Sequence, residues 1–223
     1  MQVAIALLLL LLTSLSAQAQ TMPAEFVDAA TVVDGLVVDM RYFGADNFVG
    51  KRIDGYEAPR CLLTRRAAAA LSAVQRDLVG HGLGLKVLDC YRPTRAVAHF
   101  ARWARDLADV ARKANYYPDI DKRNLFRLGY IAERSGHSRG STVDITLVQR
   151  SGGGDPDMGT PFDFFSPKSW PSDISVGNMA RRNRALLAAA MARAGFQAYA
   201  KEWWHFTLRN ETFPARYFDF PVR

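Results

Sequence analysis

Apolar residues recur with helical spacing in three parts of the chain. In residues 64–82 ("TRRAAAALSAVQRDLVGHG") they follow Thr64, a suitable N-cap, and stop before Gly80 or Gly82. A second helix is predicted over residues 93–113, opened by Pro93, whose fixed φ suits a first helical turn. The third predicted helix is marked by Leu187, Met191 and Ala194 and ends at Gly195.

Short or alternating apolar runs predict strands between and after these helices. They cover residues 31–42, 85–91, 141–148, 196–200 and 205–209. Because strands neither alternate strictly with helices nor stand alone, we expect an α+β fold in a single domain, with a mostly antiparallel sheet flanked by helices. The glycine-rich residues 150–161 are too short to separate domains and are expected to form a mobile loop.

The first nineteen residues ("MQVAIALLLLLLTSLSAQA") carry no charged side chain, and their leucine run is too short to span a bilayer. Together with the Ala-Gln-Ala ending, this predicts a cleaved signal peptide over residues 1–19 and a mature domain over residues 20–223. The alternative is an uncleaved membrane anchor, since no Lys or Arg precedes the leucines. An exported, periplasmic protein without membrane contact after cleavage is therefore expected.

The formal charge of +7 is spread over helical segments and mixed with acidic residues. This pattern favours a solvated basic surface over nucleic-acid binding, and no obligate protein partner is indicated. The chain has two cysteines, Cys61 and Cys90. In an exported protein an even count favours a disulfide, while two separately buried thiols are the alternative.

The stretch "SGHSRGSTVDITL" places an aspartate inside a predicted strand. Asp144 shares a face with Thr142 and Thr146, so the strand is half buried, and a carboxylate on an interior face needs a partner. An arginine would serve, and so would a metal ion. His137, in the glycine-containing loop before the strand, is placed to be a second ligand of such an ion.

A second motif, "KEWWHFTL", supplies His205 and Glu202. Two histidines and one aspartate leave a fourth position for water, as in catalytic zinc sites, and Glu202 would be the carboxylate beside that water. Each piece is weak alone, because a loop histidine is usually an ordinary packed residue and paired tryptophans are usually core. The other histidines, His81 and His99, have no such company and are expected to be structural.

Arg92, in "LDCYRPTRA", ends a predicted strand and precedes a proline that opens a helix. A guanidinium at a strand end can reach into a cleft and stabilise an oxyanion. A structural salt bridge is the alternative.

These residues together resemble the zinc D-alanyl-D-alanine dipeptidases of the VanX type. "SGHSRGSTVDITL" is similar to the ligand motif of that family, "EWWHF" to its E-x-W-H motif, and "DCYRP" to the segment with its catalytic arginine. The resemblance extends over nearly the whole mature chain, through "RYFGADNFVG", "YYPDI", "MGTPFDFF" and "YFDFPVR".

The resemblance implies a role for each matching residue. His137, Asp144 and His205 would hold one catalytic zinc ion, Glu202 would be the general base, and Arg92 would stabilise the oxyanion. The implied reaction is hydrolysis of the dipeptide D-Ala-D-Ala to two D-alanines.

By the same resemblance, Ser135 would help to hold the dipeptide, and Tyr42 and Asp163 would receive its ammonium group. A related alternative is a D,D-carboxypeptidase or endopeptidase acting on peptidoglycan stem peptides. A zinc-stabilised cell-wall binding module would not require a base such as Glu202 or an arginine such as Arg92. The signal-like N-terminus departs from cytoplasmic members of the family, which leaves the physiological role open.

Overall fold

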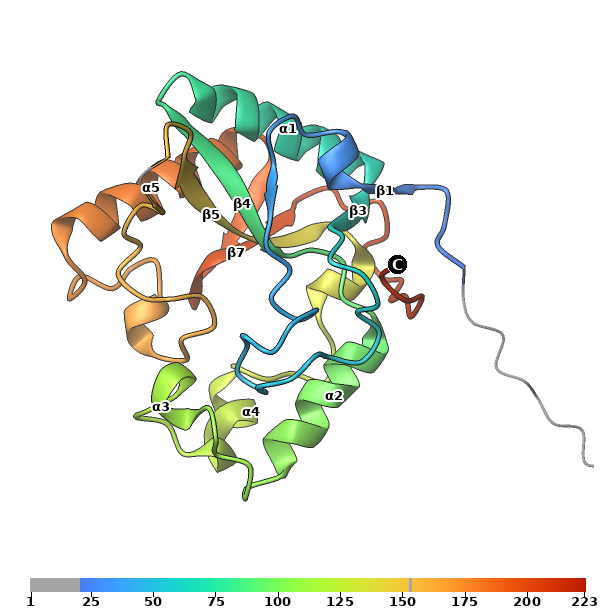
Figure 1. Ribbon diagram of the computed structural model, residues 1–223, viewed down its shortest axis with the longest axis vertical. Helices are drawn as coiled ribbons and strands as arrows, with labels where there is room; N and C mark the ends of the chain where they lie inside the picture. The colour runs from blue at the N-terminus through green and yellow to red at the C-terminus, as the bar shows by residue number, and fades with distance from the viewer. Residues whose placement is uncertain (1–20, 153) are drawn as a thin grey trace, which may run out of the picture.

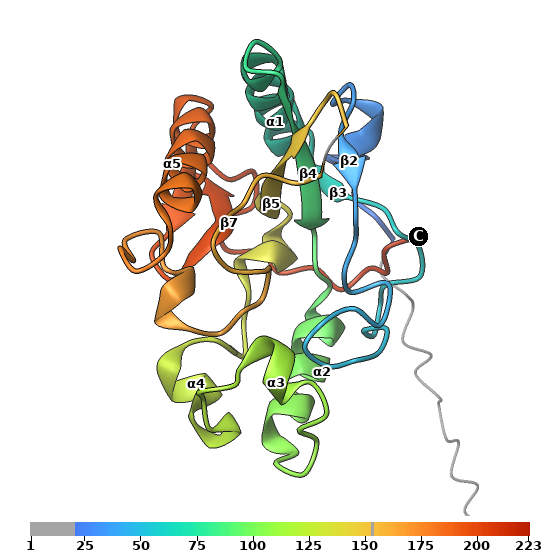
Figure 2. The ribbon, with the colours of Figure 1, turned by 60° about the vertical axis from the view of Figure 1, so that its left-hand side comes forward.

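The computed structural model describes residues 21–152 and 154–223, so the predicted signal peptide over residues 1–19 lies outside the described residues. A five-stranded sheet forms the centre of the molecule (Figures 1 and 2). In spatial order its strands are β2 (Val37–Val38), β4 (Leu83–Asp89), β5 (Thr142–Gln149), β7 (Glu202–Leu208) and β6 (Phe196–Tyr199). A second sheet pairs β1 (Phe26–Asp28) with β3 (Leu62–Thr64) in antiparallel fashion.

Two long helices pack together against the large sheet, and three shorter ones lie apart from them (Figure 2). The long pair is α1 (Arg65–Val79) and α5 (Asn178–Arg193). The others are α2 (Thr94–Arg105), α3 (Lys113–Tyr116) and α4 (Leu125–Leu128), beyond the carboxyl end of β4. Short 3-10 turns are η1 (Ala29–Thr31), η2 (Lys122–Asn124), η3 (Gly136–Arg139) and η4 (Pro167–Ser169).

The large sheet is mixed, which corrects the expectation of a mostly antiparallel sheet. The β4–β5, β5–β7 and β7–β6 pairings are antiparallel, but β2 runs parallel to β4. Parallel pairing requires a crossover connection, and here the chain passes through β3 and α1 between the two strands. The strand pattern of the sequence does not reveal this crossover.

Two predicted elements were too long. In the predicted strand over residues 31–42, only Val37–Val38 forms a strand, and the chain before it makes a 3-10 turn that the Asp28 carboxylate caps by accepting a hydrogen bond from the Ala30 amide. The predicted helix over residues 93–113 ends at Arg105. There the Lys122 ammonium donates hydrogen bonds to the carbonyl groups of Asp106 (2.7 Å) and Asp109 (2.6 Å), which hold the chain in a turn.

Other local signals were read correctly. The Thr64 side chain caps α1 by accepting a hydrogen bond from the Ala67 amide, and the helix ends at Gly80. Gly195 follows α5 with a φ of +90°, a conformation that glycine adopts without strain. The four other predicted strands are present with shifted ends.

The core lies between the sheet and the long helices. Val143, Ile145 and Leu147 of β5 are fully buried on one face of the strand, and Asp144 faces the other way. Cys61 and Cys90 are joined by a disulfide between the start of β3 and the end of β4.

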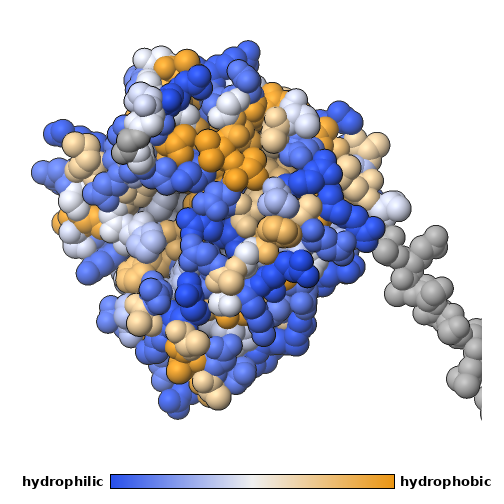
Figure 3. Space-filling view, viewed as in Figure 1, coloured by the Kyte–Doolittle hydropathy of each residue, from blue (hydrophilic) through white to orange (hydrophobic). Residues whose placement is uncertain are grey.

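Hydrophilic side chains cover most of the face seen in Figure 3, with a hydrophobic patch in its upper half. Within residues 21–152 and 154–223, no helix has the length and apolar character that a membrane span requires.

Candidate active site

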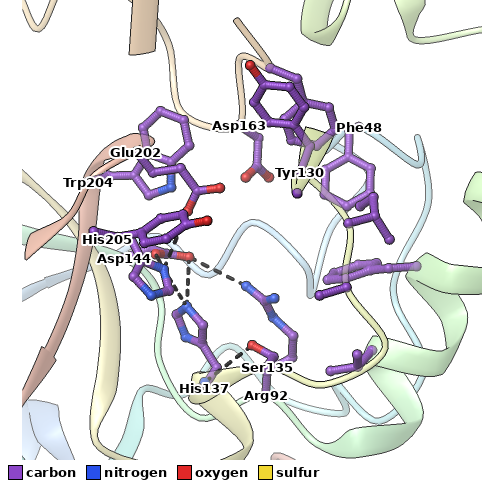
Figure 4. A pocket seen from close by; sticks show the side chains of 18 of the residues that line it. Phe48, Arg92, Tyr130, Ser135, His137, Asp144, Asp163, Glu202, Trp204 and His205 are labelled. Carbon is purple, nitrogen blue, oxygen red and sulfur yellow. Dashed lines mark hydrogen bonds and ion pairs between the residues drawn. The ribbon is translucent and has the colours of Figure 1, made fainter. Parts of the chain in front are cut away.

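A cleft of about 280 Å³ opens beside the face of the large sheet that α1 and α5 leave uncovered. Every candidate catalytic, metal-ligating and substrate-binding residue of the sequence analysis lines it (Figure 4). They are Tyr42, Arg92, Ser135, His137, Asp144, Asp163, Glu202 and His205.

The three predicted metal ligands converge in this cleft. Asp144 of β5 stands directly opposite His205 of β7 in the antiparallel ladder, and His137 reaches them from η3. His137 Nε2 lies 3.3 Å from Asp144 Oδ2 and 3.3 Å from His205 Nδ1. His205 Nδ1 lies 3.1 Å from Asp144 Oδ1. All three ligand atoms fall within 4.8 Å of one another.

The hydrogen bonds around this group fit a bound cation. His137 Nδ1 lies 2.7 Å from the Cys90 carbonyl oxygen, which can only accept, so Nδ1 carries a proton and Nε2 is the ring nitrogen that faces the group. Asp144 Oδ1 is buried, and the ring nitrogen that faces it, His205 Nδ1 at 3.1 Å, does not meet it in hydrogen-bond geometry. Two ring nitrogens and a carboxylate that face one another in this way suit a divalent transition metal.

Electrostatic effects within the group keep Asp144 ionised. Burial alone would raise the pKa of Asp144, but the charge and hydrogen bonds of His137 and His205 hold it below its ordinary value. Burial would lower the pKa of His205, yet the neighbouring Asp144 raises it. The site therefore holds a carboxylate whose charge is already balanced.

Glu202 begins β7 and lies beside this group without being one of the three ligands. Its Oε2 is 3.5 Å from His205 Nδ1. Burial raises the pKa of Glu202 to about 7, despite the opposing charge of His205. A carboxylate with such a pKa can accept and return a proton near neutral pH.

Arg92 is held from several sides, just after β4. Its Nε and Nη2 lie 2.9 Å and 2.8 Å from Asp89 Oδ2, and Nη2 is 3.5 Å from Asp144 Oδ2. The guanidinium carbon lies 5.0 Å from the ring centre of Phe100 and 5.1 Å from that of Tyr42. The guanidinium is thus fixed beside the His137–Asp144–His205 group. Arg92 makes the salt bridge that was one of the two hypotheses, and it also lines the cleft, as the oxyanion hypothesis requires.

Asp89, which is fully buried, is a further residue of the site that was not predicted from the sequence. Besides Arg92, it accepts a hydrogen bond from the Tyr56 hydroxyl (2.6 Å) and lies 3.5 Å from His137 Nδ1. A carboxylate at the end of an apolar strand, three residues before Arg92, was the available signal. The aromatic lining was also missed, and it includes Phe48, Tyr130, Phe165 and Tyr199.

Asp163 lies across the cleft from the His137–Asp144–His205 group (Figure 4), and Tyr42 also lines the cleft. The Tyr42 hydroxyl donates a 2.8 Å hydrogen bond to Asp163 Oδ2. Asp163 has a φ of +59°, the one non-glycine residue of the described chain with a positive φ, and such strain is common at functional sites. Burial, followed by the nearby charge of Asp144, raises the pKa of Asp163 well above its usual range.

Of the remaining histidine and tryptophan residues, some lie away from the cleft and one lines it. His99 lies on α2, 3.0 Å from Asp54, and does not line the cleft. Trp203 is buried and donates its indole N–H to the Thr160 hydroxyl, whereas Trp204 lines the cleft.

The site thus combines three side chains that could hold a metal ion, a buried carboxylate with a pKa of about 7 and a fixed guanidinium, a combination typical of metallopeptidase hydrolases. A family model described as D-ala-D-ala dipeptidase matches residues 22–223. The chain belongs to this family.

Curated relatives agree with this assignment. A D-alanyl-D-alanine dipeptidase of Streptomyces coelicolor is 42% identical over 90% of this chain and 100% of its own. That of Enterococcus faecium is 40% identical over 86% and 95%, and that of Escherichia coli is 35% identical over 82% and 84%. Among solved structures, the vancomycin-resistance D,D-pentapeptidase VanY in complex with Zn(II) has a TM-score of 0.40 and 16% identity, over 70% of this chain and 77% of that one.

Proposed function

We propose that this protein hydrolyses the dipeptide D-Ala-D-Ala to two D-alanines in a zinc-dependent reaction. The observation that carries the proposal is the presence in one small cleft of the His137–Asp144–His205 group and, across from it, the Asp163–Tyr42 pair. The printed activity of the curated relatives gives the substrate. The cleft is at the small end of ligand-pocket sizes, which suits a dipeptide.

The donor set of two imidazoles and one carboxylate suits zinc better than calcium or magnesium, which prefer oxygen ligands. When bound by His137, Asp144 and His205, zinc would act as a Lewis acid that activates water and polarises the scissile carbonyl.

In the proposed mechanism, the residues around this group move protons and hold charge. Glu202 accepts a proton from the attacking water and later passes it to the departing amine, a double task for which a pKa of about 7 is suitable. Arg92, held by Asp89, offers its guanidinium to the developing oxyanion. Neither residue needs to move far, because both are already packed against the cleft.

The substrate's position follows from its charges. Its ammonium group would lie at Asp163 and Tyr42, and its scissile carbonyl beside the metal ligands. The C-terminal residue then lies towards Ser135, whose hydroxyl oxygen accepts a hydrogen bond from the His137 amide. An ammonium bound in a closed end of the cleft favours dipeptides over chains extended at the N-terminus.

The test is incubation of purified protein with zinc and a panel of D,D-, L,D- and L,L-dipeptides and a stem pentapeptide. We expect two D-alanines per D-Ala-D-Ala, little release from L,L-dipeptides and none from the pentapeptide. A chelator should stop the reaction, and zinc should restore it better than magnesium. D-Alanine released from the pentapeptide but not from the dipeptide would contradict the proposal and support the carboxypeptidase alternative.

We also propose that the protein is exported and that residues 1–19 are removed. The uncharged leucine-rich start and the Cys61–Cys90 disulfide support this proposal, because disulfides persist in oxidising compartments. The mass of the protein recovered from the periplasm should match a chain that begins at Gln20 and has no free thiol. A full-length mass, or two alkylatable cysteines without reductant, would contradict it.

A further inference from the structure

His137 and Arg92 differ from Asp144 and His205 in lying outside the sheet. Asp144 and His205 face each other across the ladder of β5 and β7, so paired strands fix their positions. His137 lies in the short turn η3, and Arg92 lies in residues 90–93, which form neither helix nor strand. Both side chains reach the cleft from the same side (Figure 4). Their positions are therefore set by contacts other than strand pairing.

Cys90 is the residue on which both side chains depend. Its carbonyl oxygen accepts the 2.7 Å hydrogen bond from His137 Nδ1, and this bond orients the imidazole ring. Arg92 follows two positions later, and its amide nitrogen lies 3.4 Å from the His137 carbonyl oxygen. A shift of the Cys90 carbonyl group would therefore turn the His137 ring and displace Arg92 together.

The disulfide is the contact that fixes Cys90. β4 ends at Asp89, so regular pairing with β5 does not extend to Cys90. Cys90 is fully buried, and its sulfur is bonded to that of Cys61, which directly precedes β3. The Tyr91 amide donates a 2.9 Å hydrogen bond to the carbonyl group of Leu62 in β3. The bridge and this hydrogen bond together tie the segment after β4 to β3.

The same strand also holds the loop that carries His137. The Thr64 amide donates a 2.7 Å hydrogen bond to the Gly140 carbonyl group, and the hydroxyl oxygens of Thr64 and Ser141 lie 2.9 Å apart. β3 pairs with β1 rather than with the large sheet. These hydrogen bonds position the end of the loop, whereas the bridge is the covalent link to the carbonyl group that meets the His137 ring.

We propose that the Cys61–Cys90 bridge positions the candidate active site, in addition to stabilising the domain. By fixing the Cys90 carbonyl group it orients His137 for the metal ion, and it also sets the start of the segment that carries Arg92. The inference rests on the proposed function, in which these two residues hold zinc and stabilise the oxyanion. Cys61 and Cys90 are positioning residues, because neither lines the cleft. The affinity for zinc is then highest in the oxidising compartments where disulfides persist.

The experiment compares the parent with two double variants that lack both thiols, so that no free sulfur can bind the metal. One is Cys61→Ala with Cys90→Ala, and the other is Cys61→Val with Cys90→Ala, which restores much of the buried side-chain volume. The control is Leu71→Ala, at a fully buried position of α1 that does not line the cleft. This change lowers stability without touching the site.

Zinc dissociation constants are measured on metal-free protein by competition with a chelating dye. Circular dichroism establishes that each protein is folded at the temperature of the measurement. Both double variants should bind zinc about 10- to 100-fold more weakly than the parent, the loss typical of removing a group that orients a metal-binding histidine. Leu71→Ala should melt at a lower temperature than the parent and keep the parent's zinc affinity.

Kinetics at saturating zinc add a second readout. For the double variants, kcat for D-Ala-D-Ala should stay below that of the parent, because Arg92 is displaced as well. KM should change little, because Asp163 lies across the cleft (Figure 4). A bridge that only stabilised the domain would lower the melting temperature and leave zinc affinity, kcat and KM as in the parent.

Parent-like zinc affinity in a folded double variant would overturn the inference, as would an equal loss of affinity in Leu71→Ala. If neither double variant folds even at low temperature, the bridge serves the whole domain and the positioning role falls.

These outcomes differ from failure of the proposed function, since zinc affinity is measured without substrate. If zinc affinity depends on the bridge but the parent hydrolyses no D,D-dipeptide, the positioning role stands and the function falls. If hydrolysis is normal and zinc affinity is the same without the bridge, the function stands and the inference falls.

Discussion

The two ends of the cleft each contain a buried aspartate, and the two aspartates titrate in opposite directions. Asp144 is 1% exposed and has its pKa lowered, whereas Asp163 is 5% exposed and has its pKa raised. Burial opposes ionisation in both cases, so the difference comes from the neighbours. Asp144 faces His137 and His205, but Asp163 has the Tyr42 hydroxyl and the repelling charge of Asp144.

The comparison shows how one cleft can separate two tasks. The Asp144 end keeps its negative charge before any substrate arrives, as the proposed metal site requires. The Asp163 end favours the neutral acid until a cation comes close, so its charge is gained together with a ligand. The backbone conformations of the two aspartates also differ. Asp144 lies in a regular strand, whereas Asp163 lies in a strained turn with a φ of +59°.

A substitution in the His137–Asp144–His205 group should have the largest effect on activity. His137→Ala removes one ligand and leaves a buried carboxylate with less positive charge beside it. We expect loss of stoichiometric zinc and a fall of activity to background, measured by elemental analysis and D-alanine release. His81→Ala, an exposed histidine away from the cleft, is the control. A His137→Ala protein with full zinc content would contradict the assignment.

Glu202→Gln should separate holding the metal from using it. The change keeps size and shape but removes the proton acceptor, so zinc should stay bound while kcat falls by about 10²- to 10⁴-fold. Zinc content and kcat are measured on the same sample, with Glu25→Gln as an exposed control. Retained zinc with turnover within tenfold of the parent would exclude Glu202 as the base.

The sequence predicted the Asp144 end from local patterns and the Asp163 end only from family resemblance. An aspartate among alternating apolar residues is visible in any strand pattern, and the histidines stand in unusual phrases. Nothing local marks Tyr42 and Asp163, which are 121 positions apart and meet only in the fold. Asp89 has a local signal in its spacing to Arg92, but its contact with Tyr56, which lies 33 positions earlier, is made only in the fold.

For the fold, too, local interactions could be predicted from the sequence and contacts between distant residues could not. Capping and glycine signals gave the ends of α1 and α5, since those interactions are local. The early end of α2 depends on distant contacts, such as the Lys122 ammonium on the carbonyl groups that follow Arg105. Parallel pairing of β2 with β4 likewise depends on a crossover that no periodicity encodes.

Asp163→Asn, at the other end of the cleft, should have a smaller effect on activity. The neutral amide keeps the hydrogen-bonding shape beside Tyr42 but loses the charge for the ammonium group. We expect KM for D-Ala-D-Ala to rise about 10- to 100-fold, with a lesser change in kcat and unchanged zinc content. With an N-acetylated dipeptide, which lacks the ammonium group, KM should differ least between the parent and Asp163→Asn. A kcat loss without a KM change would contradict a binding role.

The raised pKa of Asp163 predicts that dipeptide binding is coupled to the release of a proton. Below its raised pKa the free Asp163 carboxyl is protonated, and an arriving ammonium favours the anion, so binding should release up to one proton per dipeptide. Affinity should therefore rise with pH, by at most about tenfold per unit, until the pH exceeds the pKa of the free site. The charged groups that act on Asp163 are Asp144, Arg92 and Glu202, so the measurement needs a reference that leaves them in place.

That reference is Asp163→Asn, compared with the parent on zinc-loaded protein carrying Glu202→Gln. Calorimetry between pH 6 and 7, in buffers of different ionisation enthalpy, gives the number of protons released while the dipeptide amine stays charged. The parent should release protons and the Asp163→Asn variant should not, because Glu202→Gln removes from both proteins the carboxylate whose pKa is raised to about 7, and every other group is the same in the two. Equal release by both proteins would mean that the proton comes from another group, and that the two aspartates do not divide the cleft in the way proposed.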